Sequence, residues 1–162
     1  MAKIKRNIPE LTNFRDMVVT SAEKYGDKDV YVYKNGKEEV HYSYNMLKND
    51  CECFGTALNT LGIRGHHIAV IGETSVKNTV TYIATVVSGG DIVPIDRETS
   101  VEQIINFLNL SECSAVVYSS QFDGALSAAA DKLPNLRFFI SSLIFLYTVS
   151  IKRGTRTSPL GL

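Results

Sequence analysis

The sequence lacks the features that would place it in several large classes of protein. Its 162 residues carry 17 basic and 17 acidic side chains, so the formal net charge is zero. Nucleic-acid binding needs an excess of positive charge on one face, and this balance gives no indication of it. There are only three cysteines, and residues 1–10 form a short basic arm without the apolar run of a secretory signal. We therefore expect a cytoplasmic protein with reduced thiols, an ordered chain after a flexible arm at 1–10, and no nucleic-acid partner.

Phosphate-binding motifs are missing as well. No G-x-x-x-x-G-K-[ST] segment occurs, and the apolar run at 68–71 is followed by a single glycine, Gly72, where a dinucleotide site needs several. A lone glycine after a strand is typical of a turn. The next residue, Glu73, would repel a phosphate.

Histidine and cysteine show no catalytic or metal-binding spacing. His41, His66 and His67 have no serine, cysteine or carboxylate beside them in a recognisable arrangement, so we interpret them as surface or strand-edge residues. Cys51 and Cys53 are two positions apart on an expected helix, which directs their side chains away from each other. They cannot share a metal, and we expect both to be packing thiols. Cys113 comes just before an apolar strand, and all three are expected to be free. We assign no catalytic, cofactor-binding or metal-binding residue.

The first part of the chain has strong local signals. Thr12 or Asn13 can cap a helix with apolar residues at helical spacing, and Gly26 can end it. Two β-rich runs around Asn35–Gly36 indicate a hairpin. Ser43 can then cap a helix of about five turns that stops at Gly62.

From residue 66 onward, apolar strands alternate with helical segments. We expect strands at 68–71, 92–95, 115–118 and 136–140, and helices at 75–87, 101–110 and 126–132. Such alternation with short connections predicts a three-layer α/β/α fold with a largely parallel sheet, preceded by the helix and the hairpin.

The pattern changes after residue 140. Segment 141–151 is apolar and 152–162 is basic and rich in turn residues, and the apolar run counted from Phe138 is about 14 residues, short for a bilayer span. We expect no membrane span and expect 141–162 to add nothing to the fold, with Lys152, Arg153 and Arg156 solvated and the sheet edge bare. The stretch Phe138–Tyr147 has an aggregation-prone composition. The alternative is that Leu143–Leu146 form a replacement edge element.

Several segments follow one another in the order and spacing of a known family. They include a Tyr25-Gly26-Asp27-Lys28 turn, a Tyr42-Ser43-Tyr44 entry to the long helix, a Leu61–Val70 segment and the run Gly89-Gly90-Asp91-Ile92-Val93-Pro94-Ile95-Asp96. Residues 11–140 thereby resemble part of the N-terminal domain of AMP-forming acyl-CoA synthetases, especially bacterial long-chain fatty-acid ligases. His66 departs from the pattern, since it replaces the usual acidic residue.

The resemblance implies a ligase that joins a carboxylic acid to AMP and then to coenzyme A, using ATP and Mg²⁺. It also implies that loop 96–100 lies toward the coenzyme A side, with Asp96 or Arg97 as candidates for a ligand contact. The family's phosphate loop, [ST]-G-[ST]-[ST]-G-x-P-K-G, is missing. Segment 154–161 can be laid over it only with Thr157 in place of a glycine and Leu160 in place of the lysine. We therefore expect a fragment that is inactive alone and holds no cofactor by itself; fatty acid, ATP and coenzyme A are expected only in a full-length context.

Two other interpretations stay open. The chain could be a non-catalytic interaction module on the same scaffold, or a fragment of an amino-acid adenylation domain. The opening from Phe14 to Gly26 favours the fatty-acid branch over the second of these.

Overall fold

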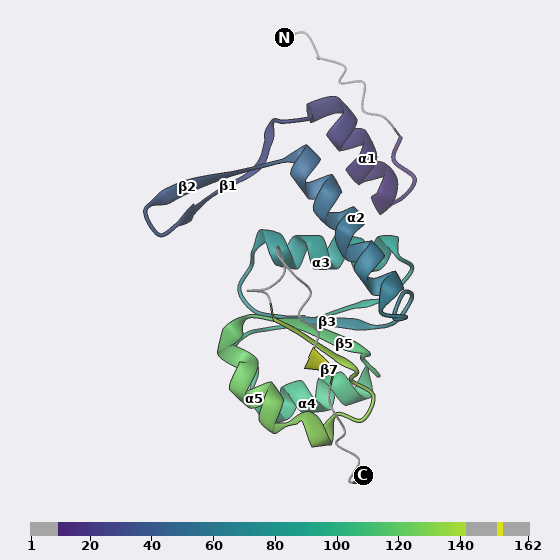
Figure 1. Cartoon of the computed structure of the whole chain (residues 1–162), viewed down its shortest axis with the longest axis vertical. Coiled ribbons are helices and arrows are strands. Elements are labelled where there is room, and N and C mark those ends of the chain that lie inside the picture. The colour runs from purple at the N-terminus through teal and green to yellow at the C-terminus, as the bar shows by residue number, and fades with distance from the viewer. Residues whose placement is uncertain (1–9, 142–151, 154–162) are drawn as a thin grey trace, which may run out of the picture. The chain divides into compact units, whose positions relative to one another are not determined.

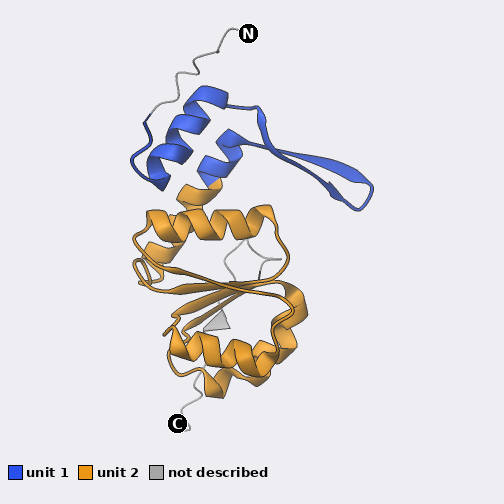
Figure 2. Ribbon diagram, turned by 180° about the vertical axis from the view of Figure 1, so that it is seen from behind, with its two compact units in different colours: residues 1–49 blue, residues 50–162 orange. Residues whose placement is uncertain are grey.

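The computed structural model describes residues 10–141 and 152–153, which fall into two compact units, Met1–Asn49 and Asp50–Leu162 (Figures 1 and 2). Helix α2 (Tyr44–Thr60) begins in the first unit and ends in the second. Each unit is described separately below.

The first unit holds helix α1 (Phe14–Tyr25) and a hairpin of β1 (Asp29–Asn35) and β2 (Glu38–Ser43). Of the two candidate caps it is Asn13 that acts, because its Oδ1 accepts a 2.9 Å hydrogen bond from the Asp16 amide. Gly26, at φ +56°, ends the helix. Ser43 caps α2, as the sequence predicts, by accepting a 3.2 Å hydrogen bond from the Met46 amide.

The second unit is built on a five-stranded sheet of order β4-β3-β5-β6-β7. The first four strands are parallel, and only β7 runs antiparallel to its neighbour. In chain order after α2 the elements are β3 (Ile68–Ile71), α3 (Val76–Val87), β4 (Ile92–Ile95), α4 (Val101–Leu110), β5 (Ala115–Tyr118), η1 (Ser120–Phe122), α5 (Asp123–Ala128), η2 (Ala130–Lys132), β6 (Phe138–Ser141) and β7 (Lys152–Arg153).

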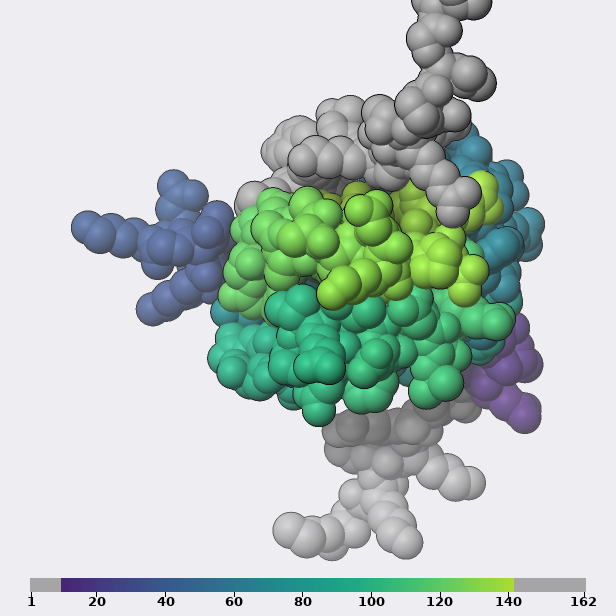
Figure 3. All heavy atoms as spheres, turned by 90° about the horizontal axis from the view of Figure 1, so that it is seen from below, coloured from purple at the N-terminus to yellow at the C-terminus, as the bar shows by residue number. Residues whose placement is uncertain are grey.

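Helices cover both faces of this sheet. Helix α3 lies on one face and α4 and α5 lie on the other (Figure 1), which confirms the three-layer α/β/α fold. All four residues of β3 and all four of β5 are buried, as the unbroken apolar runs predict. The space-filling view shows the residues from α4 to β6 closing over their side of the sheet as one continuous surface (Figure 3). A large core cluster lies beneath it: Ala69, Ile71, Ile95, Ile104, Leu108, Cys113, Val116, Tyr118, Phe122, Leu126, Ala129, Leu133 and Leu136.

Three expectations from the sequence need correction. The last helix begins at Asp123 and ends at Ala128 instead of covering 126–132, where the short η2 follows. Strand β6 starts at Phe138 and includes Ser141, which is buried and belongs to the sheet. Lys152 and Arg153 pair with Phe139 and Phe138, so the expectation that the tail adds nothing and leaves the sheet edge bare is wrong at this point. The proposed alternative strand at 143–146 lies outside the described residues.

A tight backbone contact fixes the turn before β4. A β-carbon placed on Gly90 would lie 2.4 Å from the carbonyl oxygen of His66 and 3.3 Å from Cγ2 of Thr85. The Gly90 amide also donates to the carbonyl of Thr85 at 3.0 Å. Glycine is therefore required at position 90 for space, whereas Gly89 is favoured by its φ of +79°.

Candidate functional site

The carboxyl ends of three parallel strands meet at one edge of the sheet. Ile71, the last residue of β3, is in register with Ile95 on β4 and with Tyr118 on β5. The loops that follow these strands are therefore neighbours, and this edge is where open α/β sheets bind their ligands. We take it as the candidate functional site.

An ion pair joins two of these loops. Arg97 donates to Oε1 of Glu73 at 2.8 Å, and its Nε lies 3.0 Å from Oε1 of the adjacent Glu98. All three side chains are largely exposed, so the pair contributes at most about 1 kcal/mol to stability. Its main effect is on charge, because two carboxylates neutralise the one guanidinium that the sequence places at this edge.

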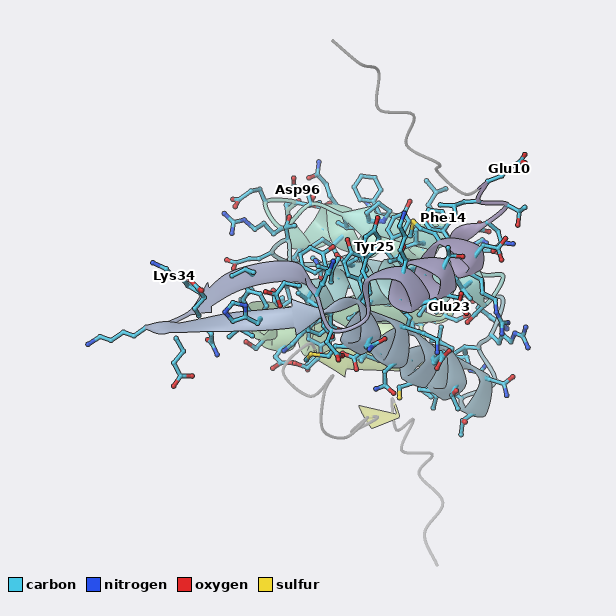
Figure 4. The ribbon with its side chains drawn as sticks, turned by 90° about the horizontal axis from the view of Figure 1, so that it is seen from above. Glu10, Phe14, Glu23, Tyr25, Lys34 and Asp96 are labelled. Atoms are coloured by element: carbon cyan, nitrogen blue, oxygen red, sulfur yellow. The ribbon has the colours of Figure 1, made fainter. Side chains whose placement is uncertain are left out.

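Asp96, labelled in Figure 4, has an internal role in the same loop. Its Oδ1 accepts a 2.8 Å hydrogen bond from the Glu98 amide, which closes a short turn after β4. The structure thus gives Asp96 and Arg97 local structural roles, and a contact of either residue with a ligand stays a prediction. The sequence could not reveal the partner of Arg97, since Glu73 is 24 residues away.

The turn after β3 is closed rather than open. Gly72 has φ +146°, and a β-carbon there would lie 3.0 Å from Oγ of Ser119. The Ser119 amide donates to the carbonyl of Ile71 at 3.1 Å, which holds the two strand ends together. Gly72 is therefore a turn glycine, as the sequence indicates, and the side of its Cα that a β-carbon would occupy is filled by Ser119.

The helices that start at this edge use their own side chains as caps. Oγ of Ser75 accepts from the Asn78 amide and Oγ of Ser100 accepts from the Gln103 amide, each at 3.3 Å.

Two titratable side chains near this edge have shifted pKa values. On the first turn of α3, partial burial lowers the pKa of Lys77 from its ordinary value, because desolvation disfavours the ammonium form. At the end of β5, burial raises the pKa of the Tyr118 phenol, and a hydrogen bond to the Asp123 carboxylate acts in the same direction. Tyr118 therefore stays protonated at neutral pH.

The histidines have partners that sequence spacing did not reveal. Nδ1 of His66 lies 2.8 Å from Oγ of Ser114. Nδ1 of His67 donates to the Ser111 carbonyl at 2.6 Å, and Nε2 of His67 lies 3.3 Å from Oδ2 of Asp91. Both lie just before β3, which confirms them as strand-edge residues. These contacts make no catalytic triad, because the serine and the aspartate act on different imidazoles.

The three cysteines are free thiols, as predicted. Burial raises the pKa of Cys51 to about 12 and that of Cys113 to about 11, and the charges of Asp50 and Glu52 add to the effect at Cys51. Cys53 is exposed, so its interpretation as a packing thiol is wrong. Within residues 10–141 and 152–153 no group of three histidine, cysteine, aspartate or glutamate side chains is arranged to hold a metal ion.

These differences predict selective alkylation. At pH 8, iodoacetamide should modify the folded protein rapidly at Cys53 and slowly at Cys51 and Cys113, because only an accessible thiolate reacts. Intact-mass measurement should show one fast adduct before denaturation and three after denaturation without reductant. Fast modification of Cys51 in the folded chain would contradict the burial of that thiol.

The comparisons with known proteins identify the family. The fold defines a three-layer α/β protein, and the model of the family described as AMP-binding enzyme matches residues 18–148, which is most of the chain. The chain therefore belongs to the AMP-binding enzyme family, which confirms the resemblance seen in its sequence. The limits at residues 11 and 140 stay a prediction.

Relatives of known sequence or structure are much longer than this chain. It is 26% identical over 127 residues to a chloroplast long-chain-fatty-acid–[acyl-carrier-protein] ligase of Arabidopsis thaliana, covering 77% of this chain but 18% of that protein. The crystal structure of the N-terminal domain of FACL13 from Mycobacterium tuberculosis superposes with a TM-score of 0.74 at 19% identity, covering 83% of this chain and 34% of that one. For the adenylation domain of a carboxylate reductase from Mycobacterium chelonae the TM-score is 0.72 at 23% identity, with coverages of 84% and 24%. At these identities the two structures support the fold alone.

Among the described residues, no helix has the length and apolar character needed to cross a membrane.

Proposed function

We propose that this chain supplies the amino-terminal scaffold of an ATP-dependent, AMP-forming ligase for a carboxylic acid, with a long-chain fatty acid as the expected substrate. The observation that carries the proposal is the family match over residues 18–148. The name of the Arabidopsis relative supports a long-chain fatty acid and an acyl-carrier-protein thiol as substrates beside ATP. The free thiols support a cytoplasmic location.

We further propose that the chain does not catalyse adenylation by itself. In the proposed reaction the carboxylate attacks the α-phosphate of ATP and releases pyrophosphate, and a thiol then displaces AMP. Phosphate binding needs backbone amides or hydroxyls around the oxygens and a lysine to balance charge. Two features of the described carboxyl edge support the proposal: Gly72 packs against Ser119, and Glu73 and Glu98 pair with Arg97. We therefore assign no step of the reaction to residues of this chain.

An exchange assay tests the absence of activity. The purified full chain, incubated with ATP, Mg²⁺, labelled pyrophosphate and fatty acids of several chain lengths, should form no labelled ATP above a no-enzyme control. An intact ligase of the family in the same buffer is the positive control. Exchange that persists through repurification of the chain would refute the proposal.

The scaffold role has an independent test at the level of DNA. If the chain is part of a ligase, the genomic sequence beyond its last codon should encode the missing phosphate loop in one of the three forward frames. A non-catalytic interaction module predicts no such sequence. That result would favour the module over the ligase scaffold.

A further inference from the structure

A histidine in the hairpin lies between two carboxylates. Nδ1 of His41 lies 2.7 Å from Oδ2 of Asp29, and its Nε2 lies 3.3 Å from Oε1 of Glu39. His41 and Glu39 belong to β2, whereas Asp29 is the first residue of β1. The imidazole therefore connects the two strands through their side chains.

This connection lies where the backbone pairing is irregular. The register pairs Val32 with His41 and Tyr31 with Tyr42, but Asp29 then pairs with Ser43, so Val30 is an extra residue in β1. Such a β-bulge disrupts the ladder of backbone hydrogen bonds locally. A two-stranded hairpin is only marginally stable in water, so a side-chain link at the bulge matters more here than it would in a larger sheet.

The chemistry of the link depends on one proton. An ionised carboxylate only accepts hydrogen bonds, so both imidazole nitrogens must donate if both contacts are to be satisfied. Only the imidazolium form does so, and the neutral ring leaves one lone pair facing a carboxylate. The hydrogen bond to Asp29 and the charge of Asp29 are the largest causes of the raised pKa of His41. Desolvation comes next and opposes them, and the charge and hydrogen bond of Glu39 raise the pKa by smaller amounts.

We propose that His41 is a proton-controlled clasp that joins β1 to β2 at the bulge, so that the order of the hairpin depends on pH. The charged groups acting on it are Asp29 from β1 and Glu39 from β2. Lys34 lies opposite Glu39 in the register. Asp29 is the nearer partner of the imidazole, at 2.7 Å against 3.3 Å for Glu39.

The direction of the pH dependence follows from the raised pKa. A histidine whose pKa is higher in the folded state than in the unfolded state stabilises the fold fully below about pH 6.5 and loses this effect as the pH rises through its folded pKa. The clasp is therefore closed at mildly acidic pH and opens as the pH rises through the raised pKa of His41.

The test uses the full-length chain and two measurements by NMR. The ring resonances of His41 should titrate with a pKa above 6.5. Amide exchange in β1 and β2, corrected for its intrinsic pH dependence, should become several-fold faster as the pH rises through that pKa. Asp29→Asn should lower the pKa of His41 toward 6.5 more than Glu39→Gln does.

Two further variants make the outcome decisive. His41→Gln should remove the pH dependence of exchange in the hairpin. His67→Gln is the matched control, since it removes another histidine that faces a carboxylate, Asp91, in the second unit; it should leave the hairpin response unchanged. A His41 pKa at or below 6.5 would overturn the proposal. So would amide-exchange rates in β1 and β2 that do not change as His41 titrates.

Discussion

Replacing Gly90 by alanine is expected to lower the free energy of unfolding by about 3 kcal/mol or more, at the upper end for an overpacked site. The added methyl group would lie 2.4 Å from the His66 carbonyl oxygen, far inside contact distance. Because that atom belongs to the backbone just before β3, it cannot rotate away, and the turn or the strand must move. Urea unfolding followed by far-UV circular dichroism measures the loss.

Gly124→Ala is the matched control for this experiment. Gly124 lies in helix α5, and a β-carbon there would meet nothing within 4 Å. Alanine is favoured over glycine in a helix, so the variant should be unchanged or more stable by up to about 1 kcal/mol. Equal stability of Gly90→Ala and the wild-type chain would show that the contact with His66 is not as close as described.

Leu108→Ala should cost about 2–5 kcal/mol, the range for removing a buried leucine side chain. Leu108 is 1% exposed and belongs to the core cluster between α4 and the sheet. Its neighbour Phe107 is 46% exposed on the same helix, so Phe107→Ala should change stability by no more than about 0.5 kcal/mol. The urea midpoints of the two variants measure both stability changes directly. Similar midpoints would mean that α4 packs on the sheet with a different face.

Local signals account for most of what the sequence predicted correctly. The cap at Asn13, the Asn35–Gly36 turn and the apolar runs of β3 and β5 each depend on residues close together in the chain. The start of α5 was missed because Gly124 has a poor helix propensity, and burial of Phe122 and Leu126 overrides it. The pairing of Lys152 and Arg153 was missed because basic residues carry no strand pattern.

The candidate site was only partly predictable, for a different reason. Its position follows from the parallel order of the strands, which the alternation of strands and helices indicates. The charge state of the site does not follow from that order, because Arg97 and Glu73 are 24 residues apart. The contact of His66 with Ser114 spans 48 residues. Sequence spacing reveals partners on one helix or one hairpin, whereas these partners meet only once the sheet has formed.

Pro94 makes the two edges of the sheet differ in how well each could pair with a further strand. It is exposed on β4, which has β3 as its only neighbour in the described sheet. Proline offers no backbone N–H, so a strand added beside β4 would find a donor missing and would pair poorly. On the opposite side, among the described residues, β7 pairs with only Phe138 and Phe139 of β6, and the last two residues of that strand have no register partner there. Within the described residues, a further strand is therefore expected to pair more readily beside the last two residues of β6 than beside β4.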